Sequence, residues 1–217
     1  MSGWIDLSHP LDDDVPRIGI FPAPSYETVL EMPDDAMTVT RMDMVVHLGT
    51  HVDAPCHFVP GGASIEQLPL ERLTGAGVVC RVDADDDEVY GVEALVDADL
   101  IRSGDIVVLH TGWWRHFSTD QYRRHPSLSV DLARWLITRR VTMVAVDTPT
   151  PDLPARLRPQ GFDWPVHHAL LGAGVLIAEH LTNLDDLSGQ RVELVLAPLN
   201  IRGADGAPVR ALGRAAD

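Results

Sequence analysis

The chain has 217 residues, of which 45% are hydrophobic, so it can bury a sizeable core, and we expect a single domain over residues 1–217. With 17 Lys and Arg against 32 Asp and Glu, the formal net charge is -15, which argues against nucleic acid or an anionic membrane surface as a partner. We find no apolar run long enough for a membrane span, no signal peptide and no disulfide framework in the two cysteines, so we expect a cytoplasmic protein.

Short β-rich segments recur along the chain, each bounded by Gly, Pro, Asp or Asn as buried strands usually are. In chain order they are residues 39–47, 78–82, 106–111, 143–147, 175–179 and 192–196. Helical features are fewer, and they predict helices over residues 92–101, from the N-cap Ser129 to about Arg139, and over 166–171. Because strands outnumber helices and the two mix along the chain, we predict an α/β (mixed α+β) fold with a mixed sheet.

Two long loops are expected, and loops of such length often carry function. Residues 10–38 contain five prolines, and residues 112–128 are aromatic and basic in an otherwise acidic protein. Trp113, Trp114 and Phe117 in the second loop either form a wall for a flat substrate or pack beneath the loop, and the sequence leaves both alternatives open.

The most informative stretch is HLGTHVDAPCH, residues 47–57, in which imidazole and carboxylate ligands are closely spaced. We expect His47 to end a strand and Gly49 to permit a tight turn after it. His51 and Asp53 are two residues apart, so they project to one face of an extended chain. Three protein ligands leave coordination positions open for water and substrate, so His47, His51 and Asp53 predict a catalytic divalent-metal site.

His57 closes the same stretch and has two possible roles, as a fourth ligand or as an acid/base group. We favour the acid/base role, because three ligands are already supplied and hydrolysis needs a group that carries a proton.

A second candidate segment, HHALLGAGVLIAE, spans residues 167–179. Glu179 lies in an apolar strand, where alternation would expose its side chain or burial would require a cation beside it, and both possibilities remain open. His167 and His168 are adjacent and point in different directions, so at most one of them is expected to be a ligand.

The eleven-residue stretch has the pattern HxGTHxDxPxH, and the chain resembles the cyclase-type metal-dependent hydrolases that carry it. This family includes bacterial kynurenine formamidases and isatin hydrolases. The resemblance covers nearly the whole chain, since five further segments occur in family order: WIDLSHPL, GDIVVLHTGW, VDTPTPD, PVHHALLGAGVLIAEHLTNL and ADGAPVRA.

The resemblance implies a swivelling β/β/α domain that assembles as a homodimer or homotetramer. It also implies that His47, His51 and Asp53 hold one metal, and that Asp53 bridges to a second metal completed by His167 and Glu179. The implied ion is Zn2+ or Mn2+, one or two per chain.

His57 matches the proton-shuttling histidine of the family. We therefore predict hydrolysis of a non-peptide amide C–N bond, with an N-formylated aromatic amine such as N-formylkynurenine as the leading substrate. The alternatives are a cyclic amide or lactone, as in the isatin hydrolases, and a metal-binding protein without catalysis. Residues 16–24, PRIGIFPAP, replace the WPGDP-like stretch of formamidases, so the resemblance leaves the substrate undetermined.

Overall fold

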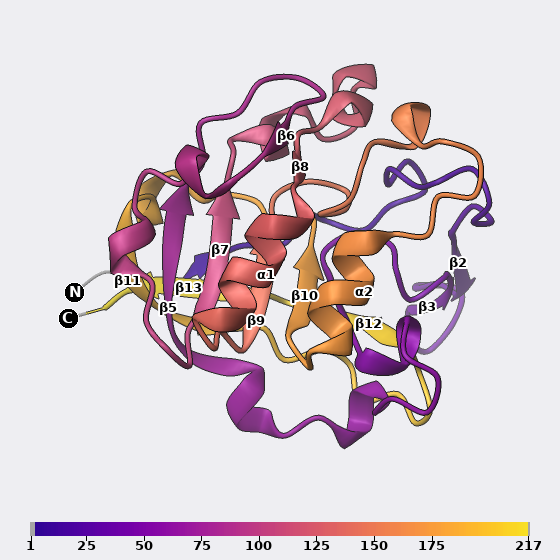
Figure 1. The fold of residues 1–217 in the computed structure, drawn as a ribbon. Helices are drawn as coiled ribbons and strands as arrows, with labels where there is room; N and C mark the ends of the chain where they lie inside the picture. Colours follow the sequence, from indigo (N-terminus) through magenta and orange to yellow (C-terminus); the bar gives the residue numbers. More distant parts are fainter. Residues whose placement is uncertain (1–2, 217) are drawn as a thin grey trace.

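A computed structural model describes residues 3–216 and contains one nine-stranded mixed sheet (Figure 1). Its centre is a block of four parallel strands, β5 (Thr74–Arg81), β7 (Ile106–His110), β9 (Met143–Val146) and β10 (Leu176–Glu179). All four fall on segments predicted as strands, which were recognisable as compact apolar runs because parallel strands are buried on both faces.

Antiparallel strands extend the block on both sides. Beyond β5 lie β11 (Gln190–Val195), β13 (Leu212–Ala215) and β1 (Ile5–Asp6), and beyond β10 lie β4 (His51–Asp53) and β12 (Gly206–Pro208). The observed α/β fold with a curled mixed sheet confirms the predicted fold class.

Two helices, α1 (Val130–Thr138) and α2 (Pro165–Gly172), cover one face of the central block (Figure 1). Strand alternation places Val78 and Cys80 in the core beneath the helices and Val79 in the core on the opposite face. Helix α1 begins as predicted, because the Ser129 side chain accepts a hydrogen bond from the Leu132 amide. No helix formed by the described residues is long and apolar enough to cross a membrane.

The helix predicted over 92–101 is wrong. The segment forms two separate 3-10 turns, Val92–Ala94 and Ala98–Leu100. Between them the chain pairs with the end of β5, where the Val96 amide donates to the Arg81 carbonyl and the Asp97 carboxylate accepts from the Arg81 side chain. These tertiary contacts replace the internal hydrogen bonds that a helix would have made.

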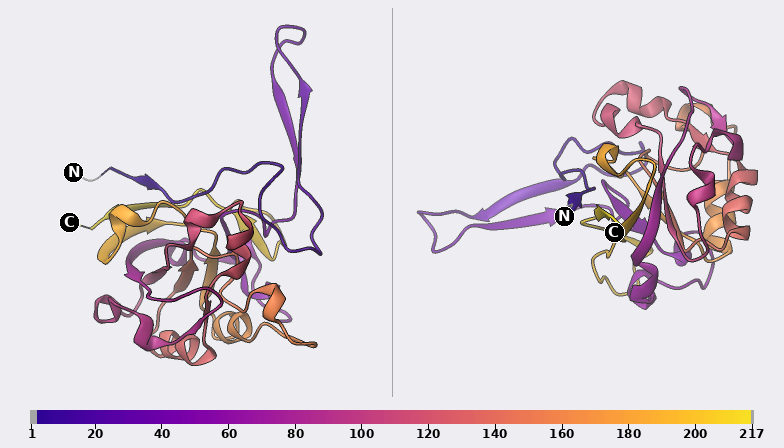
Figure 2. Two further views of the ribbon diagram at one scale, coloured as in Figure 1. Left: turned by 90° about the horizontal axis from the view of Figure 1, so that it is seen from above. Right: turned by 90° about the vertical axis from the view of Figure 1, so that its left-hand side faces the viewer.

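The strand predicted over 39–47 is only partly correct. Its first half is β3 (Val39–Asp43), which pairs with β2 (Ser25–Leu30) in a hairpin, whereas His47 lies in a turn after the strand. Figure 2 shows this hairpin projecting from the body of the protein. A further small sheet pairs β6 (Val89–Tyr90) with β8 (Ser127–Leu128).

Candidate metal centre

The register of β4 against β10 builds the floor of the site. His51 lies directly opposite Glu179, and cross-strand partners project to the same face of a sheet. Asp53 is two residues further along β4 and shares that face, as the spacing predicts. The Nε2 atom of His51 is 3.5 Å from a Glu179 carboxylate oxygen and 3.3 Å from Oδ1 of Asp53.

His47 reaches the same point from the turn that precedes β4. Gly49 adopts a φ of +63, a left-handed conformation that suits glycine in a tight turn. The Nδ1 atom of His47 lies 2.8 Å from Oδ1 of Asp53. Gly206 in β12 allows this placement, because a Cβ atom there would lie 2.7 Å from Cε1 of His47.

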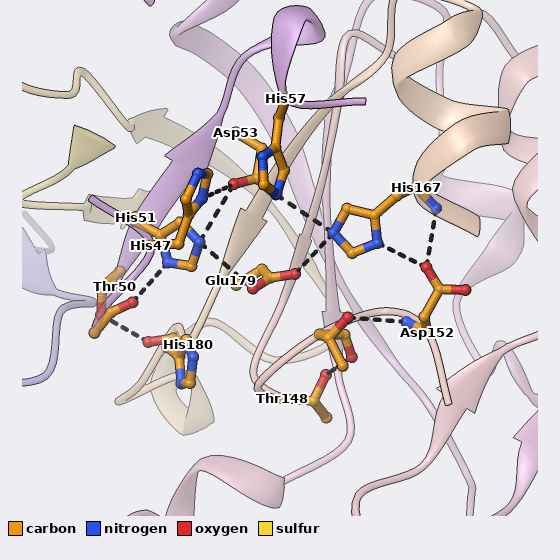
Figure 3. Close-up of polar contacts among 12 residues, drawn as sticks. His47, Thr50, His51, Asp53, His57, Thr148, Asp152, His167, Glu179 and His180 are labelled. Carbon is orange, nitrogen blue, oxygen red and sulfur yellow. Dashed lines mark hydrogen bonds and ion pairs between the residues drawn. The ribbon is translucent and has the colours of Figure 1, made fainter. Parts of the chain in front are cut away.

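His167 enters from the first turn of α2, on the other side of the site (Figure 3). Asp152 fixes it by accepting from the Val166 and His167 amides and, at 2.6 Å, from Nδ1 of His167. The ring therefore presents Nε2 to the site, where it lies 3.2 Å from Glu179 and 3.5 Å from Asp53.

Unpartnered buried atoms show that the cluster suits a cation. Nε2 of His51, Oδ2 of Asp53 and Oε1 of Glu179 have no hydrogen-bond partner among the described residues. Buried polar atoms are normally paired, so a set of unpaired lone pairs at one point fits a group that binds a cation.

Two overlapping groups of potential ligands share Asp53. One consists of His47, His51 and Asp53, and the other of Asp53, His167 and Glu179, and within each group the ligand atoms lie within 4.8 Å of one another. The structure thus brings together all five residues predicted as ligands, and the two groups fit one or two divalent cations. Glu179 is buried, which excludes the solvent-facing alternative.

The carboxylates and imidazoles of the cluster shift one another's pKa values. Burial alone would raise the pKa of Asp53, but the imidazoles of His167, His47 and His51 outweigh it and hold that pKa well below its usual range. Burial would likewise lower the pKa of His47, but Asp53 and Asp205 raise it to about 9. Asp53 is therefore ionised, which is the form in which a carboxylate binds a cation.

His57 lies beside the cluster at the end of a 3-10 turn, Pro55–His57. Its ring stacks on His47 with centroids 3.9 Å apart, and its Nδ1 atom is 3.0 Å from Oδ2 of Asp205. Burial lowers the pKa of His57, and the charge of Asp53 opposes that shift only in part. A neutral imidazole next to the site suits a group that accepts and donates a proton.

Asp152 and Asp205 are functional candidates that the sequence reasoning missed. Both lie in segments that carry the family resemblance, VDTPTPD and ADGAPVRA. The resemblance could therefore have marked both aspartates as candidates. Their partners are distant in the sequence, and only the fold shows which histidine each of them contacts.

A cavity of about 510 Å³ opens over the cluster. Phe21, Phe58, Tyr122 and Trp164 supply its aromatic walls, whereas Trp113 and Trp114 are not among the described lining residues. Trp113 is buried under its loop and donates through Nε1 to the Tyr122 carbonyl, so the packing alternative holds for it.

Comparisons with known proteins agree with this geometry. A family model described as "Putative cyclase" matches residues 5–153. A kynurenine formamidase of Geobacillus thermodenitrificans is 31% identical over 215 residues, covering 97% of this chain and 97% of the relative.

Solved structures are similar over the same extent. Isatin hydrolase A from Labrenzia aggregata, bound to benzyl benzoate, has a TM-score of 0.87 and 26% identity, with 100% of this chain and 94% of that chain covered. A structure described as a potential metal-dependent hydrolase with cyclase activity has a TM-score of 0.82 and 29% identity, with 100% of both chains covered. The chain therefore belongs to the Cyclase family of metal-dependent hydrolases and is an enzyme.

Proposed function

We propose that this enzyme hydrolyses the formamide of an N-formylated aromatic amine, with N-formylkynurenine as the leading substrate. The observation that carries the proposal is the set of unpartnered buried atoms on His51, Asp53 and Glu179, placed beside His57 under an aromatic-walled cavity. Water supplies a hydroxyl to the formyl carbon and a proton to the nitrogen as the C–N bond breaks, which yields the free amine and formate.

The proposed ligand sets are the two groups that share Asp53, out of four groups of potential ligands among the described residues. His47, His51 and Asp53 would hold one cation, and Asp53, His167 and Glu179 a second, with zinc or manganese as the proposed ion. A divalent cation held there would lower the pKa of water and polarise the substrate carbonyl. Asp152 holds the His167 ring so that Nε2 faces the site, the usual arrangement for a ligating histidine.

His57 is proposed to move the proton. An amide nitrogen is a poor leaving group until it is protonated, so a group beside the scissile bond must deliver a proton to it. Asp205 contacts Nδ1 of His57 and leaves Nε2 available for the transfer.

A second candidate is the opening of a cyclic amide, because the structure of an isatin hydrolase matches this chain with a TM-score of 0.87. Turnover of N-formylkynurenine and of isatin by the same metal-loaded preparation separates the two reactions. The third alternative, a metal-binding protein without catalysis, is wrong, since the relatives are enzymes.

Two variants test the roles of the histidines. His51→Ala should lose both bound metal and turnover, whereas His57→Gln should keep its metal and lose about 100- to 10,000-fold in kcat. The matched control is His168→Ala, which removes an exposed histidine next to His167 and should retain both properties. Full activity in metal-free His51→Ala protein refutes the proposal.

We also propose a homodimer or homotetramer in the cytoplasm. The projecting β2–β3 hairpin exposes Val29, Leu30, Met32, Met37 and Met42, which a second copy would cover.

Light scattering tests the assembly. The double substitution Met37→Glu and Met42→Glu should reduce the mass to that of a monomer. The control Leu70→Glu, at a more exposed apolar residue outside the hairpin, should not. A wild-type protein of monomeric mass contradicts the assembly, and cell fractionation checks the location.

A further inference from the structure

Arg158 is a cation in the wall of a cavity whose floor carries the Asp53 and Glu179 carboxylates. It lies in the loop that leads into α2, the helix that carries His167. Of the four arginines among the described lining residues, Arg17, Arg123 and Arg156 are exposed, whereas Arg158 is half-buried.

The Arg158 side chain is held in place without being neutralised. Its Nε atom donates to the Leu153 carbonyl at 2.8 Å, and its guanidinium carbon lies 5.3 Å from the ring centroid of Trp164 and 5.4 Å from that of Phe162. These contacts fix the plane of the guanidinium and leave its terminal nitrogens without a hydrogen bond to any described residue.

Arg156 and Arg124 are paired with acids, whereas the exposed lining arginines Arg17 and Arg123 have no ion pair within residues 3–216. Arg156, two residues away, forms an ion pair with Asp87, and Arg124 forms one with Asp86. For Arg158 no ion pair is found within residues 3–216. The two acids whose charges act on Arg158 belong to the metal cluster and its support, since Glu179 lies beside His51 and His167, and Asp152 binds His167.

An unpaired, half-buried cation is unfavourable unless an anion pairs with it. Burial lowers the pKa of the Arg158 guanidinium, and the charges of Asp152 and Glu179 oppose that shift, so Arg158 lies within the electrostatic reach of the metal cluster. A planar guanidinium with free terminal N–H groups is suited to binding a carboxylate through two parallel hydrogen bonds.

We propose that Arg158 binds a carboxylate of the substrate, and that the enzyme therefore selects aryl formamides that carry a carboxylate group. This inference rests on the proposed function and narrows its substrate class. The aryl ring packs among the aromatic walls, and the carboxylate lies on the guanidinium beside Trp164. N-formylkynurenine carries such a group and isatin does not, so Arg158 separates the two candidate substrates.

A series of three substrates isolates the carboxylate. The first is N-formylkynurenine, the second is its analogue without the ammonium group, and the third is ortho-formamidoacetophenone, which keeps the aryl formamide and has no carboxylate. In metal-loaded Arg158→Gln protein, KM should rise about 10- to 100-fold for the two carboxylates, and kcat should change little. The kcat/KM for ortho-formamidoacetophenone should stay within about twofold of wild type.

Two further variants control for loss of structure. Arg158→Lys keeps the positive charge but lacks the paired N–H donors of a guanidinium. It should recover part of the affinity for the two carboxylate-bearing substrates. Arg124→Gln removes an exposed arginine that lies outside the cavity lining and pairs with Asp86, and all three substrates should behave as with wild type. An equal loss for charged and uncharged substrates in Arg158→Gln, or no loss at all, overturns the proposal.

Binding of the product gives a reading that is independent of turnover. In calorimetry, kynurenine should bind metal-loaded wild-type protein at least about tenfold more tightly than Arg158→Gln, and ortho-aminoacetophenone should bind both proteins equally. If formamides are not hydrolysed but this difference is found, the proposed function fails and the carboxylate site stands. If formamides are hydrolysed and Arg158→Gln binds kynurenine as wild type does, the carboxylate site is wrong.

Discussion

Oδ2 of Asp205 lies 3.0 Å from Nδ1 of His57, so a carboxylate from the C-terminal part of the chain orients the proposed proton carrier. The same oxygen is 2.9 Å from Nε2 of His47. One acid therefore links a proposed ligand to the acid/base group, whose rings are stacked.

Asp205→Asn should lower turnover by about 10- to 100-fold, because an amide neither holds the His57 ring as firmly nor stabilises its charged form. The expected signature is a loss in kcat together with a changed pH–rate profile, measured alongside metal content. Asp186→Asn, at an exposed aspartate, is the control and should leave both unchanged. An unaltered pH profile in Asp205→Asn would contradict an orienting role.

Removal of metal should lower the thermal stability of the protein. With the ion gone, the buried Asp53 and Glu179 lose a counter-charge, and an ion present at 1,000 times its Kd contributes about 4 kcal/mol to folding. Differential scanning calorimetry should show a higher Tm after zinc or manganese is added to chelated protein. Glu179→Gln should shrink this rise and His168→Ala should preserve it; an equal rise in all three proteins would point to binding elsewhere.

Stability should also fall in mild acid because of His125. Burial lowers the pKa of His125 to about 4, against 6.5 for an exposed histidine. Between these values the unfolded chain binds a proton that the folded protein does not, so the free energy of unfolding decreases as pH falls through this window. The expected loss is on the order of 3 kcal/mol by pH 4. Urea unfolding of chelated protein at several pH values should show a shallower decrease for His125→Gln, and identical slopes would contradict the assignment.

Tyr122→Phe should destabilise the wall of the cavity. The Tyr122 hydroxyl lies 2.8 Å from Nδ1 of His180, and both groups are buried, so the variant leaves a ring nitrogen without its partner. We expect a loss of about 1–3 kcal/mol in the free energy of unfolding. Tyr90 is equally buried, but no hydrogen bond of its hydroxyl is found within the described residues, so Tyr90→Phe should cost less. Denaturant titration at neutral pH compares the two, and equal losses would show that the His180 contact contributes nothing.

Patterns within short stretches of the sequence predicted the central strands of the sheet and the common face of His51 and Asp53. Buried apolar runs mark parallel strands, and a spacing of two residues fixes a common face, so neither inference needs distant information. The family resemblance added His167 and Glu179, which spacing alone left undecided.

Interactions between distant residues explain the failures. Residues 92–101 have helical spacing, but pairing with Arg81 at the end of β5 decides their structure. The β2–β3 hairpin is exposed, so it lacks the buried alternation that marks a strand. Asp152, Arg158 and Asp205 are charged loop residues whose importance depends on what lies next to them in space.

Strand β4 carries two of the proposed ligands, yet both of its neighbours in the sheet, β10 and β12, come later in the chain. A ribosome-bound chain that ends before β10 therefore displays the histidine-rich stretch with no strand to order it and without Glu179. The complete set of proposed ligands, with β4 ordered between its neighbours, exists only when synthesis is nearly finished. The ion that the enzyme acquires is then decided by what the finished protein encounters in its compartment, and not by what is available to the nascent chain.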